Sequence, residues 1–142
     1  MRMSVRKTVS TMLTVCTVAA ILVPVLRAQT LAIKPRVIEV IADKDNTFKV
    51  RGESRPVIRL KAGEKVVLRI TSHFGGEKAR DDSVHSFVVK KLRDQGWDLR
   101  LQEGTEDFTL MAPKSPGEYE IECTVKCGPG HDDMKMKLIV QS

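Results

Sequence analysis

The sequence predicts an all-β domain, an antiparallel β-sandwich of seven or eight short strands. Short segments rich in β-branched and other apolar residues recur at a spacing of roughly 8–12 residues, which is typical of sandwiches. Gly, Pro, Asn and Asp separate these segments and favour turns. No segment after residue 30 keeps a helical apolar period for three turns. A chain of 142 residues, 42% of them hydrophobic, has enough apolar side chains for one domain with a real core.

Each expected strand follows from its local pattern. Residues 65–71 (KVVLRIT) are rich in β-branched side chains, which favour strands. Residues 118–124 (EYEIECT) alternate acidic residues with Tyr119, Ile121 and Cys123, so Cys123 should face inward at a strand end. Residues 57–60 lead into a turn, residues 99–103 extend briefly, and residues 72–82 form a polar loop. The longer strands are expected at residues 36–41, 47–51, 65–71, 84–92, 106–111, 118–124 and 134–140.

Residues 1–28 are predicted to be a signal peptide or a membrane anchor. A basic stretch at residues 1–7 precedes an uncharged, apolar stretch at residues 11–26, as in export signals. Cleavage near Ala28 and an uncleaved anchor through residues 8–26 both fit this pattern. Residues 29–35 are expected to be a linker and residues 36–142 the folded domain, located in the periplasm or facing outward at the cytoplasmic membrane.

The formal charge of +6 arises mostly in this N-terminal segment. It holds four basic residues and no acidic one, which leaves 20 basic and 18 acidic residues in the rest of the chain. Nucleic-acid binding needs a concentrated basic surface, so no nucleic-acid partner is expected. The sequence also lacks a Ser/His/Asp triad, a carboxylate pair and a phosphate-binding glycine loop. We therefore do not expect the chain to be a catalyst by itself.

The stretch CTVKCGPGHDDM, residues 123–134, carries the most chemistry. It holds two thiols, an imidazole and a thioether, and soft sulfur ligands together with imidazole favour copper. His85, within the segment DSVHSF, is the other candidate ligand. On a straight strand Cys123 and Cys127 would lie about 13 Å apart. The Gly-Pro-Gly sequence at residues 128–130 permits a tight loop instead, in which the donors of this stretch converge.

The residues by themselves leave the number of metal ions open. His85, Cys127, His131 and Met134 match the ligands of a mononuclear blue-copper site, two His, one Cys and a weak Met. Cys123 is then a spare thiol, unless it bridges to a second copper ion.

Each candidate ligand also has a purely structural interpretation. The two cysteines can form a disulfide, as exported thiols tend to do without a metal. That leaves the spacing of His131 and Met134 unexplained. His85 can be a satisfied core histidine, and Met134 can pack in a strand like Met136. His73, in the glycine-containing loop, is expected to be solvated or to cover the metal site.

Three segments together resemble a known family. They are D-x-x-H-S-F at residues 82–87, C-x3-C-G-x2-H-x2-M at residues 123–134, and PGEY at residues 116–119. They look like the binuclear copper A (CuA) domain of cytochrome c oxidase subunit II, which nitrous oxide reductase shares. The resemblance spans roughly residue 36 to the C-terminus and implies a cupredoxin-like Greek-key sandwich.

This resemblance implies a centre of two copper ions per chain that transfers one electron at a time. The bridging ligands would be Cys123 and Cys127, with one imidazole on each copper from His85 and His131, a weak bond from Met134 to one copper, and the backbone carbonyl of Val125 on the other. Ser86, Phe87 and Tyr119 are candidates for the shell of low polarity around the centre. The implied partner is a redox protein such as a c-type cytochrome or an oxidase catalytic subunit.

The chain departs from the oxidase pattern in three respects. Subunit II has two membrane helices and an aromatic patch that receives electrons, whereas this chain has at most one short apolar segment and a lone Trp97. The family usually has Glu at the position of Val125, and that Glu binds a metal ion shared with the catalytic subunit. The resemblance therefore carries over the copper site and not membership of an oxidase complex.

Two other functions use the same residues. A periplasmic copper carrier or sensor needs ligands that a partner can reach and a weak, exchangeable site. A thiol–disulfide enzyme is disfavoured, because the spacing is Cys-x3-Cys and no helix N-terminus is available to stabilise a thiolate.

Overall fold

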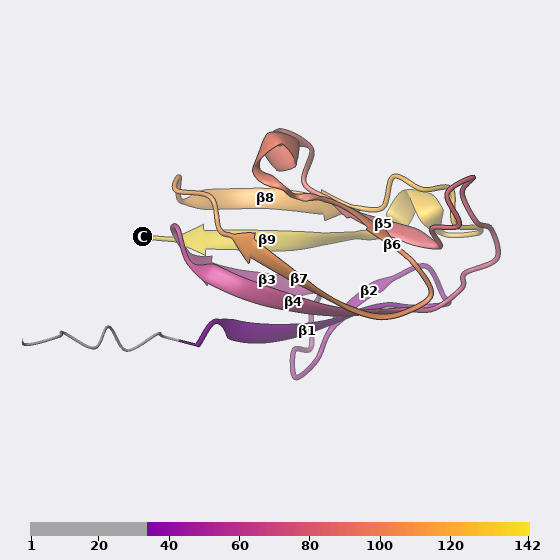
Figure 1. The fold of residues 1–142 in the computed structure, drawn as a ribbon, viewed down its shortest axis with the longest axis horizontal. Coiled ribbons are helices and arrows are strands. Elements are labelled where there is room, and N and C mark those ends of the chain that lie inside the picture. The colour runs from indigo at the N-terminus through magenta and orange to yellow at the C-terminus, as the bar shows by residue number, and fades with distance from the viewer. Residues whose placement is uncertain (1–33) are drawn as a thin grey trace, which may run out of the picture. The chain divides into compact units, whose positions relative to one another are not determined.

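The computed structural model describes residues 34–142, which form two β-sheets packed face to face (Figure 1). This confirms the predicted all-β sandwich. Two short 3-10 helices, η1 and η2, lie outside the sheets. The elements in chain order are β1 (Arg36–Ala42), β2 (Phe48–Val50), β3 (Val57–Lys61), β4 (Lys65–Ser72), β5 (His85–Val88), η1 (Lys90–Gln95), β6 (Asp98–Leu101), β7 (Gly104–Met111), β8 (Gly117–Glu122), η2 (His131–Asp133) and β9 (Lys135–Gln141).

The strands are ordered β2-β1-β4-β7 in one sheet and β3-β9-β8-β5-β6 in the other. Most neighbours are antiparallel, but β1 pairs with β4, and β3 with β9, in parallel. The sequence pattern did not contain this feature. Apolar alternation buries one face of a strand whichever way its neighbour runs, so it carries no information about the direction of pairing.

The core lies between the two sheets, and in strands such as β4 and β9 it follows from the alternation of buried and exposed residues. In β4 the side chains of Val66, Leu68 and Ile70 are buried, whereas Lys65 and Arg69 are exposed. Burying an aliphatic side chain of this size stabilises the fold by about 1.5–3 kcal/mol. The packed sheets thus hold the strand ends in place, and the loops that join these ends can position side chains.

The strand expected at residues 84–92 ends early, because β5 stops at Val88 and η1 follows. Trp97 closes this segment: its carbonyl accepts the N–H of Val89 at 2.9 Å. The indole of Trp97 is fully buried and donates to the carbonyl of Met111 at 3.0 Å. Residues 84–92 mix apolar residues with His, Ser and Lys, and so short a pattern does not distinguish a strand from a tight helical turn.

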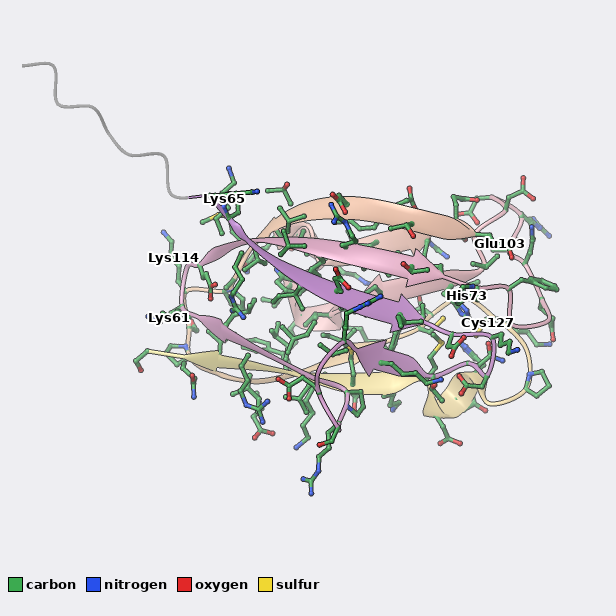
Figure 2. The ribbon with its side chains drawn as sticks, turned by 90° about the horizontal axis from the view of Figure 1, so that it is seen from below. Lys61, Lys65, His73, Glu103, Lys114 and Cys127 are labelled. Atoms are coloured by element: carbon green, nitrogen blue, oxygen red, sulfur yellow. The ribbon has the colours of Figure 1, made fainter. Side chains whose placement is uncertain are left out.

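The loops that carry the candidate ligands gather at one end of the sandwich. His73 and Cys127 lie at this end, and Lys61, Lys65 and Lys114 lie at the opposite end (Figure 2). No helix within residues 34–142 is long and apolar enough to cross a membrane. The signal peptide or anchor predicted at residues 1–28 lies outside the described residues.

Candidate metal centre

Three predicted ligands meet in the interior of the sandwich. A ring nitrogen of His85 and the Sγ atoms of Cys123 and Cys127 all lie within 4.8 Å of one another. His85 begins β5, and Cys123 directly follows β8. Since β5 and β8 are antiparallel neighbours in one sheet, the sheet itself brings the imidazole beside the thiol.

Cys127 occupies the middle of the cluster. Its Sγ lies 3.8 Å from the Sγ of Cys123, 3.6 Å from Nδ1 of His131 and 3.9 Å from Sδ of Met134. The carbonyl oxygen of Val125 lies 3.3 Å from the Sγ of Cys123. The chain therefore turns back on itself as the Gly-Pro-Gly sequence predicts, and all the predicted donor groups come together.

Positive backbone dihedrals make this turn possible. Gly128 has φ 122° and Gly130 has φ 87°, a region that residues with a side chain adopt at a cost. The N–H of His131 donates to the carbonyl of Gly128 at 3.2 Å, and the N–H of Met134 donates to the carbonyl of His131 at 3.1 Å. This short helical turn sets the directions of the last two predicted ligands, which precede β9.

Most of the cluster is shielded from water. His85, Cys127 and Met134 have 0% exposed surface and Cys123 has 6%, whereas His131 is partly exposed. An open groove of about 490 Å³ borders Cys123, His131 and Met134. The cluster is therefore a buried site with one edge near the surface, at His131.

The two cysteines are free thiols and not a disulfide. Their Sγ separation of 3.8 Å exceeds a disulfide bond of about 2.05 Å, yet both sulfurs can reach a metal ion about 2.3 Å from each. The pKa of Cys127 is raised to about 12, mainly because the thiol is buried and to a smaller extent because Cys123 lies beside it. Without a metal this thiol stays protonated near neutral pH, and a bound cation would take the place of its proton.

His85 is oriented as metal-binding histidines are. Its Nε2 lies 2.8 Å from the carbonyl oxygen of His73, so Nε2 carries the proton and donates. Its Nδ1 is buried and has no hydrogen-bond partner among the described residues. Burial also lowers the pKa of His85 and so favours the neutral ring. A satisfied core histidine would pair both nitrogens, whereas this one keeps a lone pair available to a cation.

The donor set fits copper. Two thiols and a thioether are soft donors, and with two imidazoles they match the preferences of copper better than those of Mg²⁺ or Ca²⁺, which favour oxygen. The unpaired Nδ1 of His85 is independent evidence that a positive centre fits here, since an orphaned buried acceptor costs about 1–3 kcal/mol.

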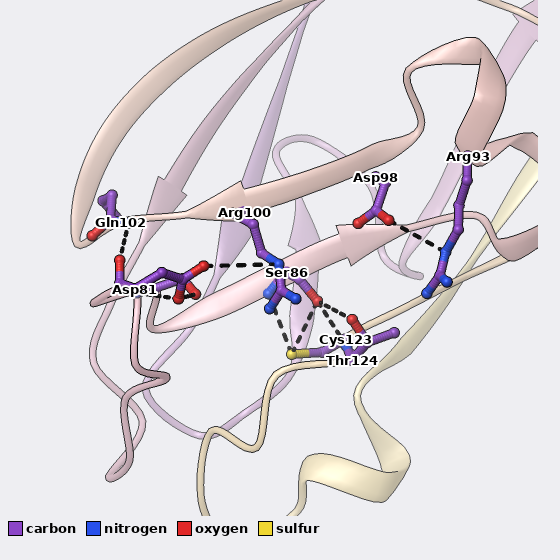
Figure 3. Close-up of polar contacts among 9 residues, drawn as sticks. Asp81, Ser86, Arg93, Asp98, Arg100, Gln102, Cys123 and Thr124 are labelled. Atoms are coloured by element: carbon purple, nitrogen blue, oxygen red, sulfur yellow. Dashed lines mark hydrogen bonds and ion pairs between the residues drawn. The ribbon is translucent and has the colours of Figure 1, made fainter.

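Ser86 forms part of the shell around the cluster, as expected. Ser86 donates its backbone N–H to the Sγ of Cys123 at 3.4 Å, and its hydroxyl lies 3.9 Å from the same sulfur (Figure 3). The N–H of Thr124 donates to Ser86 Oγ at 2.7 Å. Phe87 is fully buried and packs edge-to-face on Phe48, with ring centroids 5.5 Å apart.

The expectation that Tyr119 belongs to this shell is wrong. Its hydroxyl donates to the carbonyl of Ser115 at 2.8 Å, near the end of the sandwich where Lys114 lies. Tyr119 and Cys123 do alternate on one face, but four strand residues separate them by about 13 Å. Alternation predicts the face of a strand and not the position along it.

The sequence did not predict two groups that contact the site. The carbonyl of His73 orients His85, although the side chain of His73 is exposed as expected. A backbone acceptor leaves no signal in the sequence. Asn46, which belongs to a polar sequence (residues 43–46) that predicts only a turn, is 2% exposed and donates to the carbonyl of Pro129 in the ligand loop, residues 123–134. The one signal it offered is that Asn tolerates a positive φ, here 56°.

No protein-family model and no curated protein sequence matches the chain. Among solved structures it is similar to a chain of a heme-copper terminal oxidase dimer, with TM-score 0.55 and 20% identity over 88% of this chain and 78% of that one. The periplasmic domain of subunit II of cytochrome oxidase from Bradyrhizobium japonicum aligns with TM-score 0.50 and 12% identity, over 75% and 84%. Auracyanin B aligns with TM-score 0.50 and 20% identity, over 77% and 91%.

These similarities concern the fold. The sheet order and the parallel pairs β1–β4 and β3–β9 define the sandwich, and the structures that it resembles include a subunit II periplasmic domain and an auracyanin. Residues 34–142 of this chain therefore form a cupredoxin-type β-sandwich.

Proposed function

We propose that the folded domain is a one-electron-transfer module that holds two copper ions in a CuA-like centre. The observation that carries this proposal is the pair of buried free thiols, Cys123 and Cys127, with Sγ atoms 3.8 Å apart, beside the unpaired Nδ1 of His85. His131, Met134 and the Val125 carbonyl complete the proposed ligand set. When bound, copper supplies a one-electron redox couple.

The chain contributes a rigid, water-poor site for this couple. The strands β5 and β8 hold His85 and Cys123, and the hydrogen bond to the His73 carbonyl fixes the ring of His85 before any metal arrives. Ligands that are already placed move little when the charge of the site changes. Little movement is the condition for fast electron exchange, and the apolar surroundings keep water from competing for the site.

We further propose that the domain works outside the cytoplasm, with a redox protein as its partner. The basic and apolar pattern of residues 1–28 supports export. A c-type cytochrome and an oxidase catalytic subunit are the candidate partners. The partly exposed edge of the site at His131 is where a partner could approach most closely.

Burial argues against the copper-carrier alternative. A carrier must present its ligands to a partner, whereas His85, Cys127 and Met134 have 0% exposed surface. The mononuclear alternative leaves the thiol of Cys123 without a role. The Sγ of Cys123 nevertheless lies close enough to the Sγ of Cys127 for both sulfurs to bind the same ion. A binuclear centre uses every donor in the cluster.

The test is copper loading of the purified domain, followed by metal analysis and EPR of the oxidised form. We expect two coppers per chain, intense visible absorption and the EPR pattern of one unpaired electron shared by two copper nuclei. One copper per chain with a four-line pattern would replace the binuclear centre by a mononuclear one. Rapid transfer of copper to a modest chelator would favour the carrier.

A further inference from the structure

We propose that Asn46 is a positioning residue that fixes the separation between the two halves of the metal centre, a role that rests on the proposed function. Asn46 lies in the turn between β1 and β2, outside the set of predicted ligands. It is 2% exposed. Its amide Nδ2 donates to the carbonyl of Pro129 at 2.6 Å and to that of Gly75 at 3.3 Å. One side chain thus ties together two loops that are far apart in the sequence.

Each of these loops controls one half of the centre. Pro129 lies between Cys127 and His131, so a hydrogen bond to its carbonyl holds the loop that carries these two residues. Gly75 follows His73, whose carbonyl accepts the Nε2–H of His85 at 2.8 Å. The loops also touch directly, since the N–H of Glu77 donates to the Cys127 carbonyl at 3.2 Å. A shift of the amide of Asn46 would therefore move the imidazole of His85 relative to the sulfur of Cys127.

The packing around this amide leaves little free space. A Cβ built on Gly75 would lie 2.0 Å from Oδ1 of Asn46, and a Cβ on Gly128 would lie 2.6 Å from the Gly75 carbonyl oxygen. Reversing the amide would place its oxygen against two carbonyl oxygens, so only one orientation fits. The amide therefore acts as a spacer of fixed length between the two loops.

The turn itself does not depend on this side chain. The backbone N–H of Asn46 donates to the carbonyl of Asp43 at 2.9 Å. Thr47 donates its hydroxyl to Asp45 Oδ1 at 2.6 Å, and Lys49 bridges Asp43 and Asp45. Glycine tolerates the positive φ of 56° at position 46. Asn46→Gly thus removes the amide with little disturbance of the turn, and Thr47→Ala is the matched control that disturbs the turn and keeps the amide.

The experiment compares wild type, Asn46→Gly and Thr47→Ala, first without metal and then with copper. In the metal-free proteins, the amide hydrogen of Glu77 should exchange about tenfold faster in Asn46→Gly than in the other two. With copper, Asn46→Gly should release the metal to a chelator about tenfold faster and show altered copper hyperfine splitting in EPR. Thr47→Ala should keep the wild-type spectrum.

Gly75→Ala tests the same spacer sterically, because no positive φ restricts this position and the new Cβ would meet Oδ1 of Asn46. It should reproduce the spectral change of Asn46→Gly, and the double variant should change the spectrum by less than the two single changes together. Wild-type exchange and spectrum in Asn46→Gly would overturn the role of Asn46, as would equal changes in Thr47→Ala. If wild type binds no copper, the proposed function fails, while the exchange of Glu77 still tests the spacer.

Discussion

Ser86 donates its backbone N–H to the Sγ of Cys123 at 3.4 Å, across the pairing of β5 with β8. Because Ser86 follows His85 directly, one strand supplies a candidate ligand and, from the next residue, a hydrogen bond to the sulfur of another. Hydrogen bonds to a metal-bound sulfur withdraw electron density from it and so tune the redox potential of a site.

Ser86→Ala should lower the redox potential of the copper centre. The change removes the hydroxyl, which lies 3.9 Å from the Sγ of Cys123, and keeps the backbone donor. A sulfur with fewer donors stabilises the oxidised metal, so we expect a fall of about 20–60 mV, where 59 mV is a tenfold change for one electron. Redox titration monitored by visible absorption measures it. Ser83→Ala is the control, since Ser83 is also buried but bonds to Asp81; an equal fall there would contradict the prediction.

Cys123→Ser should reduce the copper content from two ions to at most one per chain. The hydroxyl of serine is a poor bridging ligand for soft metals, so the shared electron of the binuclear centre should be lost. Metal analysis and EPR provide the measurement. Lys126→Ala, an exposed change between the two cysteines, should keep the wild-type signal. A wild-type spectrum in Cys123→Ser would show that this thiol is no bridge.

Trp97→Phe should destabilise the metal-free domain by about 1–3 kcal/mol without changing the copper site. The indole is fully buried and donates to the carbonyl of Met111 at 3.0 Å, and phenylalanine leaves that carbonyl without its donor. Urea denaturation of both proteins gives the free energy of unfolding. Met111→Ala, at a side chain that is 52% exposed, keeps the carbonyl and should change stability by less than about 0.5 kcal/mol.

Glu64→Gln should lower the free energy of unfolding at pH 7 and should make that free energy depend less on pH in the acid range. Glu64 accepts hydrogen bonds from Arg36 at 2.9 and 3.1 Å and from the N–H of Lys61 at 2.8 Å. The bond from Arg36 is the main cause that lowers the pKa of Glu64 below its ordinary value of 4.5. A lowered folded-state pKa stabilises the fold above the unfolded value and loses this effect as pH falls through the folded one.

We therefore expect a stability difference between wild type and Glu64→Gln of about 0.5–1 kcal/mol at pH 7, the range of a partly exposed ion pair. The difference should shrink as the pH falls below about 4.5. Urea denaturation at pH 7 and at pH 3 measures both values. A difference that is the same at the two pH values would mean that the pairing with Arg36 does not contribute. Glu64 bonds to Lys61, which lies at the end of the sandwich opposite Cys127 (Figure 2), so copper content should stay unchanged.

Local sequence patterns predicted much of the fold and of the candidate site. The alternation in residues 118–124 predicted that Ile121 and Cys123 face the core, because every second residue of a strand shares a face. Gly128 and Gly130 predicted the tight ligand loop, because glycine alone adopts their φ values without strain. The donor types of residues 123–134 predicted a soft metal, since ligand chemistry is a property of the side chain itself.

Distances between separate segments were decided only by the tertiary structure. The sequence named His85 and Cys123 as partners through a family resemblance, but the pairing of β5 with β8 brings them within 4.8 Å. Which nitrogen of His85 is free depends on the carbonyl of His73, and the separation of the loops depends on the amide of Asn46. A residue's own pattern determines its local conformation, whereas contacts across the fold depend on how all the intervening chain packs.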